Sequence, residues 1–109
     1  MEQRDLILVR FPFSDYTSGK VRPAVIVSHD AYNKRFGDVL AVPLTSNLDE
    51  RDYAVLLMQK DLEKGSLVKE SKIKVDKMFS VDKTLVSMKI GKVNKSTFEK
   101  IKKELFSLV

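Results

Sequence analysis

The sequence "KVRPAVIVSHD", from Lys20 to Asp30, places a charged residue directly before an apolar run. The run Ala24–Ser28 is rich in small and β-branched residues, which predicts a buried strand. Pro23 disfavours helical geometry in the residue before it, so that Arg22 is expected to be extended at the start of this strand. The position of an arginine at the mouth of a buried strand therefore needs an explanation.

Further strands are predicted on both sides of this run. The first strand candidate, Leu6–Phe13, precedes this run and is followed by a polar loop that contains Ser14. In the third strand candidate, Val39–Thr45, Pro43 indicates an edge position or a bulge, because proline donates no hydrogen bond to a neighbouring strand. A fifth candidate alternates apolar and polar residues, which would place Lys77 on the buried side, so that either a bulge re-aims its side chain or it points into something polar. The other predicted strands are Leu6–Phe13, Val39–Thr45, Tyr53–Gln59 and the segment 71–81, and one helical turn is expected between residues 29 and 38.

The end of the chain is predicted to be helical. Ser96 and Glu99 have the spacing of a capping box at a helix N-terminus. Phe98, Ile101, Leu105 and Leu108 recur at helical spacing and form one apolar stripe. About five short strands and one C-terminal helix indicate an α+β fold that is mostly β, a small antiparallel barrel-like sheet.

Composition limits the classes of function. The chain has 109 residues, which favours a single domain over residues 1–109. It has no cysteine, which excludes disulfides and thiol nucleophiles and fits a reducing compartment. Its N-terminal apolar run is too short for a signal peptide or a membrane span, so we expect a soluble cytoplasmic protein with no membrane contact. The net charge of +5 suits an anionic partner or solubility alone.

The common catalytic signatures are missing. There is one histidine, His29, and the four glycines are scattered, so that no multi-histidine metal site or phosphate-binding loop is expected. We therefore expect no metal and no cofactor, and any catalysis would use Arg, Lys, Ser, Thr and carboxylates. RNA cleavage suits that set, because the RNA supplies its own nucleophile, the 2′-hydroxyl.

Two residues fit the phosphate-binding part of such a reaction. Arginine offers a fork of donors to phosphate oxygens, and a threonine hydroxyl adds one more. Arg22 begins the second strand and Thr45 ends the third, so that the two would flank one cleft if these strand ends meet. Taken singly, Arg22 could be a surface charge paired with a carboxylate, and Thr45 an ordinary strand residue.

Taken together, the segments resemble the MazF/PemK family, the toxins of type II toxin–antitoxin modules. The resemblance is carried by "DLILVRFPFSD", "RPAVIVS", "AVPLTSN", "ESKIKVDKMFSVDK" and "IGKVNKSTFEKIKKELFSL", in that order along nearly the whole chain. It implies an SH3-like barrel of the CcdB–MazF type that forms a homodimer. It also implies an endoribonuclease (an mRNA interferase) that cuts single-stranded RNA at short sequences without metal and leaves a 2′,3′-cyclic phosphate, and a cognate antitoxin that is acidic.

The resemblance assigns roles to residues. The family's catalytic arginine falls on Arg22 and its catalytic threonine on Thr45. Lys74 and Asp76 match a basic and an acidic residue that could serve as acid and base, although solvent-facing strand charges explain them equally well. The family often has glutamine where Lys77 stands and arginine where Phe79 stands, which puts base specificity in question.

RNA contacts are expected outside this catalytic set. The loop from Ser14 to Lys20 is expected to border the RNA groove, unless it is an ordinary hairpin loop. Ser46, next to Thr45, and Lys77 are the other predicted RNA-binding residues. Ser14 and Lys20 are the two residues of the loop that we expect to contact RNA.

Two other functions remain open at this point. The gyrase-poisoning toxins share this architecture but act by binding a protein target, so that fold alone does not separate them from nucleases. An RNA-binding or regulatory module that has lost cleavage is the second alternative, and the departures at Lys77 and Phe79 are compatible with it.

Overall fold

The structure is a computed structural model that describes residues 1–10 and 21–109. Within these ranges eight strands form one antiparallel sheet in the order β4-β6-β3-β2-β1-β8-β5, and β7 also pairs with β3. The strands are β1 (Asp5–Arg10), β2 (Val21–Ile26), β3 (Asp38–Thr45), β4 (Ala54–Leu57), β5 (Leu62–Gly65), β6 (Ser71–Lys74), β7 (Phe79–Asp82) and β8 (Val86–Val93). The helices are α1 (Asp30–Arg35) and α2 (Lys95–Phe106), with 3₁₀ turns η1 (Gln59–Asp61), η2 (Val75–Lys77) and η3 (Lys83–Leu85).

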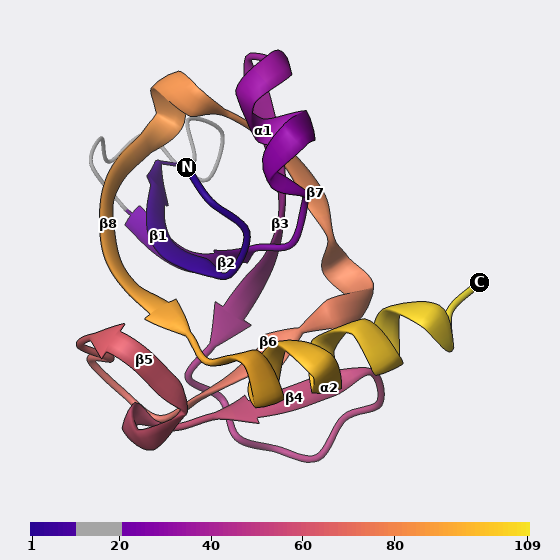
Figure 1. Cartoon of the computed structure of the whole chain (residues 1–109). Helices are drawn as coiled ribbons and strands as arrows, with labels where there is room; N and C mark the ends of the chain where they lie inside the picture. The colour runs from indigo at the N-terminus through magenta and orange to yellow at the C-terminus, as the bar shows by residue number, and fades with distance from the viewer. Residues whose placement is uncertain (11–20) are drawn as a thin grey trace.

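The sheet curls into a partly closed barrel, with β4, β6 and α2 forming a layer across one end (Figure 1). Successive residues of β1 and β2 enter two different cores, so that both faces of these strands are buried. This explains the unbroken apolar run of β2, because a strand covered on both faces has no polar side. One core contains Leu6, Val25, Val42, Leu44, Val55, Leu57, Ile73, Val75, Val93, Phe98 and Ile101, and the other contains Ile7, Val9, Ala24, Ile26, Val39, Ala41 and Val81. The predicted class, mostly β with a C-terminal helix, is confirmed.

Pro43 occupies a central strand, because β3 has neighbours on both sides. On one side β3 pairs with β2, and Pro43 is opposite Ala24. On the other side β3 pairs with β7 as far as Ala41 and with β6 from Leu44 onward. Pro43 therefore lies where the neighbouring strand is interrupted, which is a different solution from the edge or bulge that we expected.

The interruption is the turn η2, which divides the predicted strand 71–81 into β6 and β7. Ile73 and Val75 are buried, as their alternation predicts. The turn then redirects Lys77 outward, and its side chain is 61% exposed. The alternation therefore fails at Lys77, because period two holds only while the strand continues.

Two strands were missed by the sequence analysis. β5 lies in the segment 61–70, where no strand was predicted, and β8 precedes the predicted helix. Gly65 ends β5 with φ of 91°, and it packs directly on the main chain of β8. The other predicted strands are present with ends shifted by a few residues, and the residues of the first candidate beyond Arg10 lie outside the described ranges.

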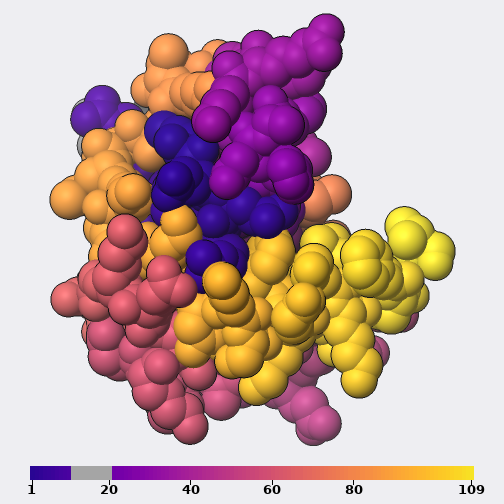
Figure 2. Space-filling model, in the orientation of Figure 1, coloured from indigo at the N-terminus to yellow at the C-terminus, as the bar shows by residue number. Residues whose placement is uncertain are grey.

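The two helices differ in how well their ends were predicted. The expected turn after β2 is α1, capped by His29, whose ring nitrogen accepts the N–H of Ala31. In α2 the predicted capping box is wrong: Asn94 is the cap, accepting the N–H of Thr97, and Ser96 lies inside the helix. The C-terminal end of α2, yellow in Figure 2, projects from the body of the molecule. No helix in the described ranges is long and apolar enough to cross a membrane.

Candidate functional site

A cavity of about 750 Å³ lies where the ends of β2 and β3 face β6, η2 and β7. Its other walls come from β1, β8 and the connection between β5 and β6. Five of the predicted site residues line it: Arg22, Thr45, Ser46, Lys74 and Lys77. The structure thus brings together residues from three separate segments of the sequence.

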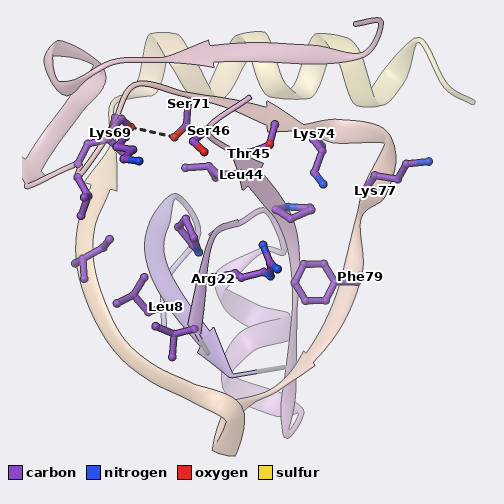
Figure 3. Close-up of a pocket in the computed structure, with 16 residues that line it drawn as sticks. Leu8, Arg22, Leu44, Thr45, Ser46, Lys69, Ser71, Lys74, Lys77 and Phe79 are labelled. Atoms are coloured by element: carbon purple, nitrogen blue, oxygen red, sulfur yellow. Dashed lines mark hydrogen bonds between the residues drawn. The ribbon is translucent and has the colours of Figure 1, made fainter. Parts of the chain in front are cut away.

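Arg22 enters this cavity from the start of β2 (Figure 3). Its side chain is exposed, and its guanidinium has no hydrogen-bond or ion-pair partner among residues 1–10 and 21–109. The alternative that Arg22 is neutralised by a carboxylate therefore finds no support in the described part of the chain. A guanidinium without a counter-charge, in a concave site, is suited to bind an anionic group.

Thr45 ends β3 at the rim of the same cavity. Its Oγ1 accepts the backbone N–H of Asn47 at 3.2 Å, which fixes the side chain at the first turn of the following loop. Because that bond uses a lone pair of the hydroxyl and not its proton, the proton remains available to donate. Ser46 is exposed beside it.

Three lysines line the cavity, Lys69, Lys74 and Lys77, and the two that were predicted as site residues behave differently. Lys74 is half-buried at the end of β6, and the nitrogen ends of Lys74 and Arg22 point into the same space, while Lys77 points away from it (Figure 3). Nothing in the described ranges pairs with the Lys74 ammonium, whereas Lys77 lies 3.6 Å from the carboxylate of Asp76. Arg22 and Lys74 therefore form the cationic centre of the cavity.

Asp76 is not among the residues that line the cavity. Its Oδ1 accepts a hydrogen bond from Nη2 of Arg51 at 3.0 Å, and its Oδ2 faces Lys77. Lys74 thus lines the cavity and Asp76 does not, although sequence reasoning had grouped the two. Arg51 was missed, since nothing in the polar segment "SNLDERD" distinguishes it from a solvated charge.

The remaining wall is apolar and was also missed. Leu67 and Val68 come from the connection between β5 and β6, and Phe79 and Ile90 come from β7 and β8. Phe79 is half-buried, and Val68 is 89% exposed at the rim. Apolar and aromatic walls beside cations suit a ligand with flat apolar parts and anionic linkers, which describes a nucleic acid strand.

Two of the predicted RNA contacts cannot be placed in the structure, and no group of metal ligands is found among the described residues. Ser14 and Lys20 lie outside the described residues. Across residues 1–10 and 21–109, no three His, Asp or Glu side chains are grouped as metal ligands would be.

Comparison with known proteins gives one family and one fold. A sequence model of PemK-like, MazF-like toxins of type II toxin–antitoxin systems matches residues 2–109. No curated protein matched the chain.

Solved structures similar to this chain include MazF from Deinococcus radiodurans in a MazE–MazF complex, with 22% identity and a TM-score of 0.81 over 99% of this chain and 94% of that one. MazF alone from the same organism has 23% identity and a TM-score of 0.77 over 99% and 94%. An endoribonuclease from a mycobacterial species has 20% identity and a TM-score of 0.78 over 98% and 88%. At these identities the structures establish a common fold.

Proposed function

Given that the chain belongs to the family of PemK-like, MazF-like toxins of type II toxin–antitoxin systems, we propose that it is an endoribonuclease that cleaves single-stranded mRNA at short sequences without a metal ion. The cavity around Arg22 is the proposed active site. Several solved structures of the same fold are described as endoribonucleases, and this supports the assignment.

One observation carries the proposal: the guanidinium of Arg22, which has no partner among residues 1–10 and 21–109, shares a cavity of about 750 Å³ with the ammonium of Lys74 and the hydroxyl of Thr45. A phosphodiester group has two non-bridging oxygens that accept such donors. Charge on these oxygens grows in the transition state, so that donors fixed around them lower the barrier and do more than bind the ground state.

The reaction needs no nucleophile from the protein. The 2′-oxygen attacks the adjacent phosphorus, the bond from phosphorus to the 5′-oxygen breaks, the 2′-proton is removed and the 5′-oxygen gains a proton. The products are a 2′,3′-cyclic phosphate and a 5′-hydroxyl end. Arg22 and Lys74 would neutralise the phosphate, and Thr45 would orient it by donating its hydroxyl proton to one oxygen.

The proposed partners follow from the family and from charge. We expect a homodimer and a cognate antitoxin, as implied by membership of a toxin–antitoxin family. A net charge of +5 favours an acidic antitoxin and also single-stranded RNA. Ser46 and Lys77 are the further RNA contacts that we propose among the described residues. Ser14 and Lys20 remain predictions from the sequence.

The chemical test uses the 2′-hydroxyl itself. Cuts are first mapped on a long single-stranded RNA, and two short RNAs containing one cut site are then compared. One is all-ribose and the other carries a single 2′-deoxyribose at the nucleotide before the scissile phosphate. The proposal predicts that the deoxy substrate binds with similar affinity and is not cut.

Three results would overturn the proposal. Cleavage of the deoxy substrate at the ribose rate would mean that the nucleophile is not the 2′-hydroxyl. Failure to cut any RNA, together with inhibition of DNA supercoiling by gyrase, would assign the chain to the non-catalytic toxins. Salt-sensitive RNA binding without cleavage would assign it to the binding modules instead.

A further inference from the structure

We propose that Arg51 and Asp76 form a positioning pair for the cavity, and that Asp76 acts as an anchor for Arg51 and not as the base. The pair fastens the loop 46–53 onto η2 and so supports the side chains of Thr45 and Lys74, whose strands are paired directly at Leu44–Ile73 and Thr45–Lys72. This inference rests on the proposed ribonuclease function for its catalytic consequence, but the fastening itself can be measured without activity.

The loop that follows Thr45 is fixed at every second residue. Asn47 donates its N–H to Thr45 Oγ1 at 3.2 Å, and its own side chain accepts the N–H of Asp49 at 2.9 Å. The carbonyl of Asp49 accepts a hydrogen bond from Lys72 Nζ at 3.1 Å. A series of contacts therefore leads from the Thr45 hydroxyl, along the loop, to strand β6.

Arg51 supplies the next contact of the series. Its Nη2 donates to Asp76 Oδ1 at 3.0 Å, with side chains only 31% and 24% exposed. The Nε of Arg51 is buried and has no hydrogen-bond partner in the described part of the chain. A partly buried guanidinium depends mainly on the hydrogen bond to its carboxylate partner. Removing the Asp76 carboxylate would therefore free the side chain of Arg51.

The loop then closes on the residue that follows Lys74. Val75 donates its backbone N–H to the carbonyl of Tyr53 at 3.0 Å, and Ala54 is paired with Lys74 across β4 and β6. Tyr53 has a φ of 54°, a left-handed conformation that a non-glycine residue adopts only where neighbouring contacts hold it. The Arg51–Asp76 pair joins the loop that begins after Thr45 to the turn η2 that begins after Lys74, and these are the two residues that the mechanism needs aligned.

The same contacts argue against proton transfer to Asp76 during the reaction. Oδ1 is occupied by Arg51, Oδ2 faces Lys77 at 3.6 Å, and the residue does not line the cavity. To accept a proton from a 2′-hydroxyl, the carboxylate would have to leave Arg51 and thereby free the loop. Anchoring and base catalysis are thus alternatives that an experiment can separate.

The experiment compares Arg51→Met, Asp76→Asn and the double variant in single-turnover cleavage of one RNA, over a range of pH. Positioning predicts that each single variant loses about ten- to a hundredfold in rate, with a smaller change in RNA affinity, because misplacement of reacting groups costs rates of this order. The double variant should lose no more than either single one, since both remove the same contact. Arg51→Lys should recover part of the rate, and the pH profiles should keep the wild-type shape.

The matched control is Glu63→Gln. Glu63 accepts a hydrogen bond from Arg4 at 3.0 Å, the same distance as in the Arg51–Asp76 pair, and neither residue lines the cavity. This variant also turns one carboxylate of an arginine pair into an amide, and it should leave cleavage unchanged. Thermal unfolding of every variant checks that a loss of rate is not a loss of fold.

Amide hydrogen exchange gives a readout that needs no cleavage. Peptides covering 46–53 should exchange faster in Arg51→Met and Asp76→Asn than in wild type or in Glu63→Gln. Unchanged exchange in this loop would overturn the positioning role, even if the wild-type protein cut no RNA. If the wild type cuts, a much larger loss in Asp76→Asn than in Arg51→Met, with the acidic limb of the pH profile abolished, would identify Asp76 as the base.

Discussion

Ala24 of β2 is paired with Pro43 of β3, and this pairing places Arg22 and Thr45 at the same end of two neighbouring antiparallel strands. Each lies two residues beyond the pair, Arg22 before Ala24 and Thr45 after Pro43. The interruption of the neighbouring strand by η2 opens the cavity beside Pro43. Pro43 and the proposed active site therefore both lie at the break between β6 and β7.

Replacement of Arg22 tests the cationic centre. Arg22→Ala should lower the cleavage rate by on the order of a hundredfold or more, as does the loss of one preorganised donor to a developing oxyanion. Arg22→Lys keeps the charge but loses the fork of donors, and its cleavage rate should lie between those of the wild-type protein and Arg22→Ala. Because the side chain is exposed and unpaired within the described ranges, the melting temperature of either variant should match wild type. A loss of only a few-fold in folded Arg22→Ala would remove Arg22 from the mechanism.

Two variants separate the proposed roles of the Thr45 hydroxyl from the contribution of the side chain's β-branched shape. Thr45→Val keeps the β-branched form but removes the acceptor for Asn47 and the donor to the phosphate. We expect a loss of about tenfold or more in rate. Thr45→Ser keeps the hydroxyl and should stay near wild type in single-turnover cleavage. Equal rates for Val and Ser would show that the hydroxyl takes no part.

Lys74 should contribute to RNA binding mainly through charge. The logarithm of the RNA association constant should fall linearly with the logarithm of salt concentration, and each phosphate contact on a single strand contributes a slope of about −0.7. Lys74→Gln should therefore make the slope shallower by about 0.7. Fluorescence anisotropy with an uncleavable 2′-deoxy strand over a salt series measures it. Lys100→Gln, at an exposed position of α2 outside this cavity, is the control and should leave the slope unchanged.

Asp38 should make the stability of the fold depend on pH in two ranges. Hydrogen bonds from Ser80 and then Tyr32 lower the pKa of Asp38, and the same bond to Asp38 raises the pKa of Tyr32. The contribution of Asp38 is present above its ordinary pKa of 3.8 and is lost as pH falls through the lowered value. The contribution of Tyr32 is present below its ordinary pKa of 10.0 and is lost as pH rises through the raised value.

Thermal unfolding of wild type and Asp38→Asn across pH tests this linkage. The variant should melt at a lower temperature near neutral pH, and the gap should narrow toward strong acid and strong alkali. A gap that stays constant at every pH would show that neither group is linked to folding.

Gly65 should be required by the contact between β5 and β8. A Cβ atom at this position would lie 2.2 Å from the carbonyl oxygen of Ile90, and the φ of 91° is unfavourable for other residues. Gly65→Ala should therefore lower the free energy of unfolding by about 1–3 kcal/mol, or more. Gly37→Ala is the matched control, because a Cβ there meets nothing within 4 Å, and it should change stability by less than about 0.5 kcal/mol. Urea unfolding of both variants gives the comparison, and equal effects would refute the steric argument.

Much of the fold was predictable where the sequence has a strong period. The apolar run of β2 and the stripe through Phe98 and Ile101 predicted their elements, because burial decides which residues these positions tolerate. β5 was missed because it has only four residues, two of them charged, whereas β8 was missed although Val86, Met88 and Ile90 alternate with Ser87 and Lys89 in the period of a strand. In the structure both strands are held by main-chain pairing, β5 with β8 and β8 with β1.

The candidate site was predictable only in part for a similar reason. Arg22 and Thr45 stand at strand ends that the register brings together, and the family resemblance identified both. Arg51 and Asp76 are 25 residues apart in sequence, and their contact depends on how the loop 46–53 folds back on η2. The apolar wall of Leu67 and Val68 comes from a segment whose composition predicts only a polar connection.

The central claim is that this fold cuts RNA with Arg22 and without metal. The most direct measurement incubates purified protein with a long single-stranded RNA in excess EDTA, beside Arg22→Ala, and analyses the ends of the products. The account predicts discrete cuts bearing 2′,3′-cyclic phosphate and 5′-hydroxyl ends with the wild-type protein and intact RNA with the variant. RNA that stays intact with the wild-type protein, or that is cut equally well by Arg22→Ala, would contradict it.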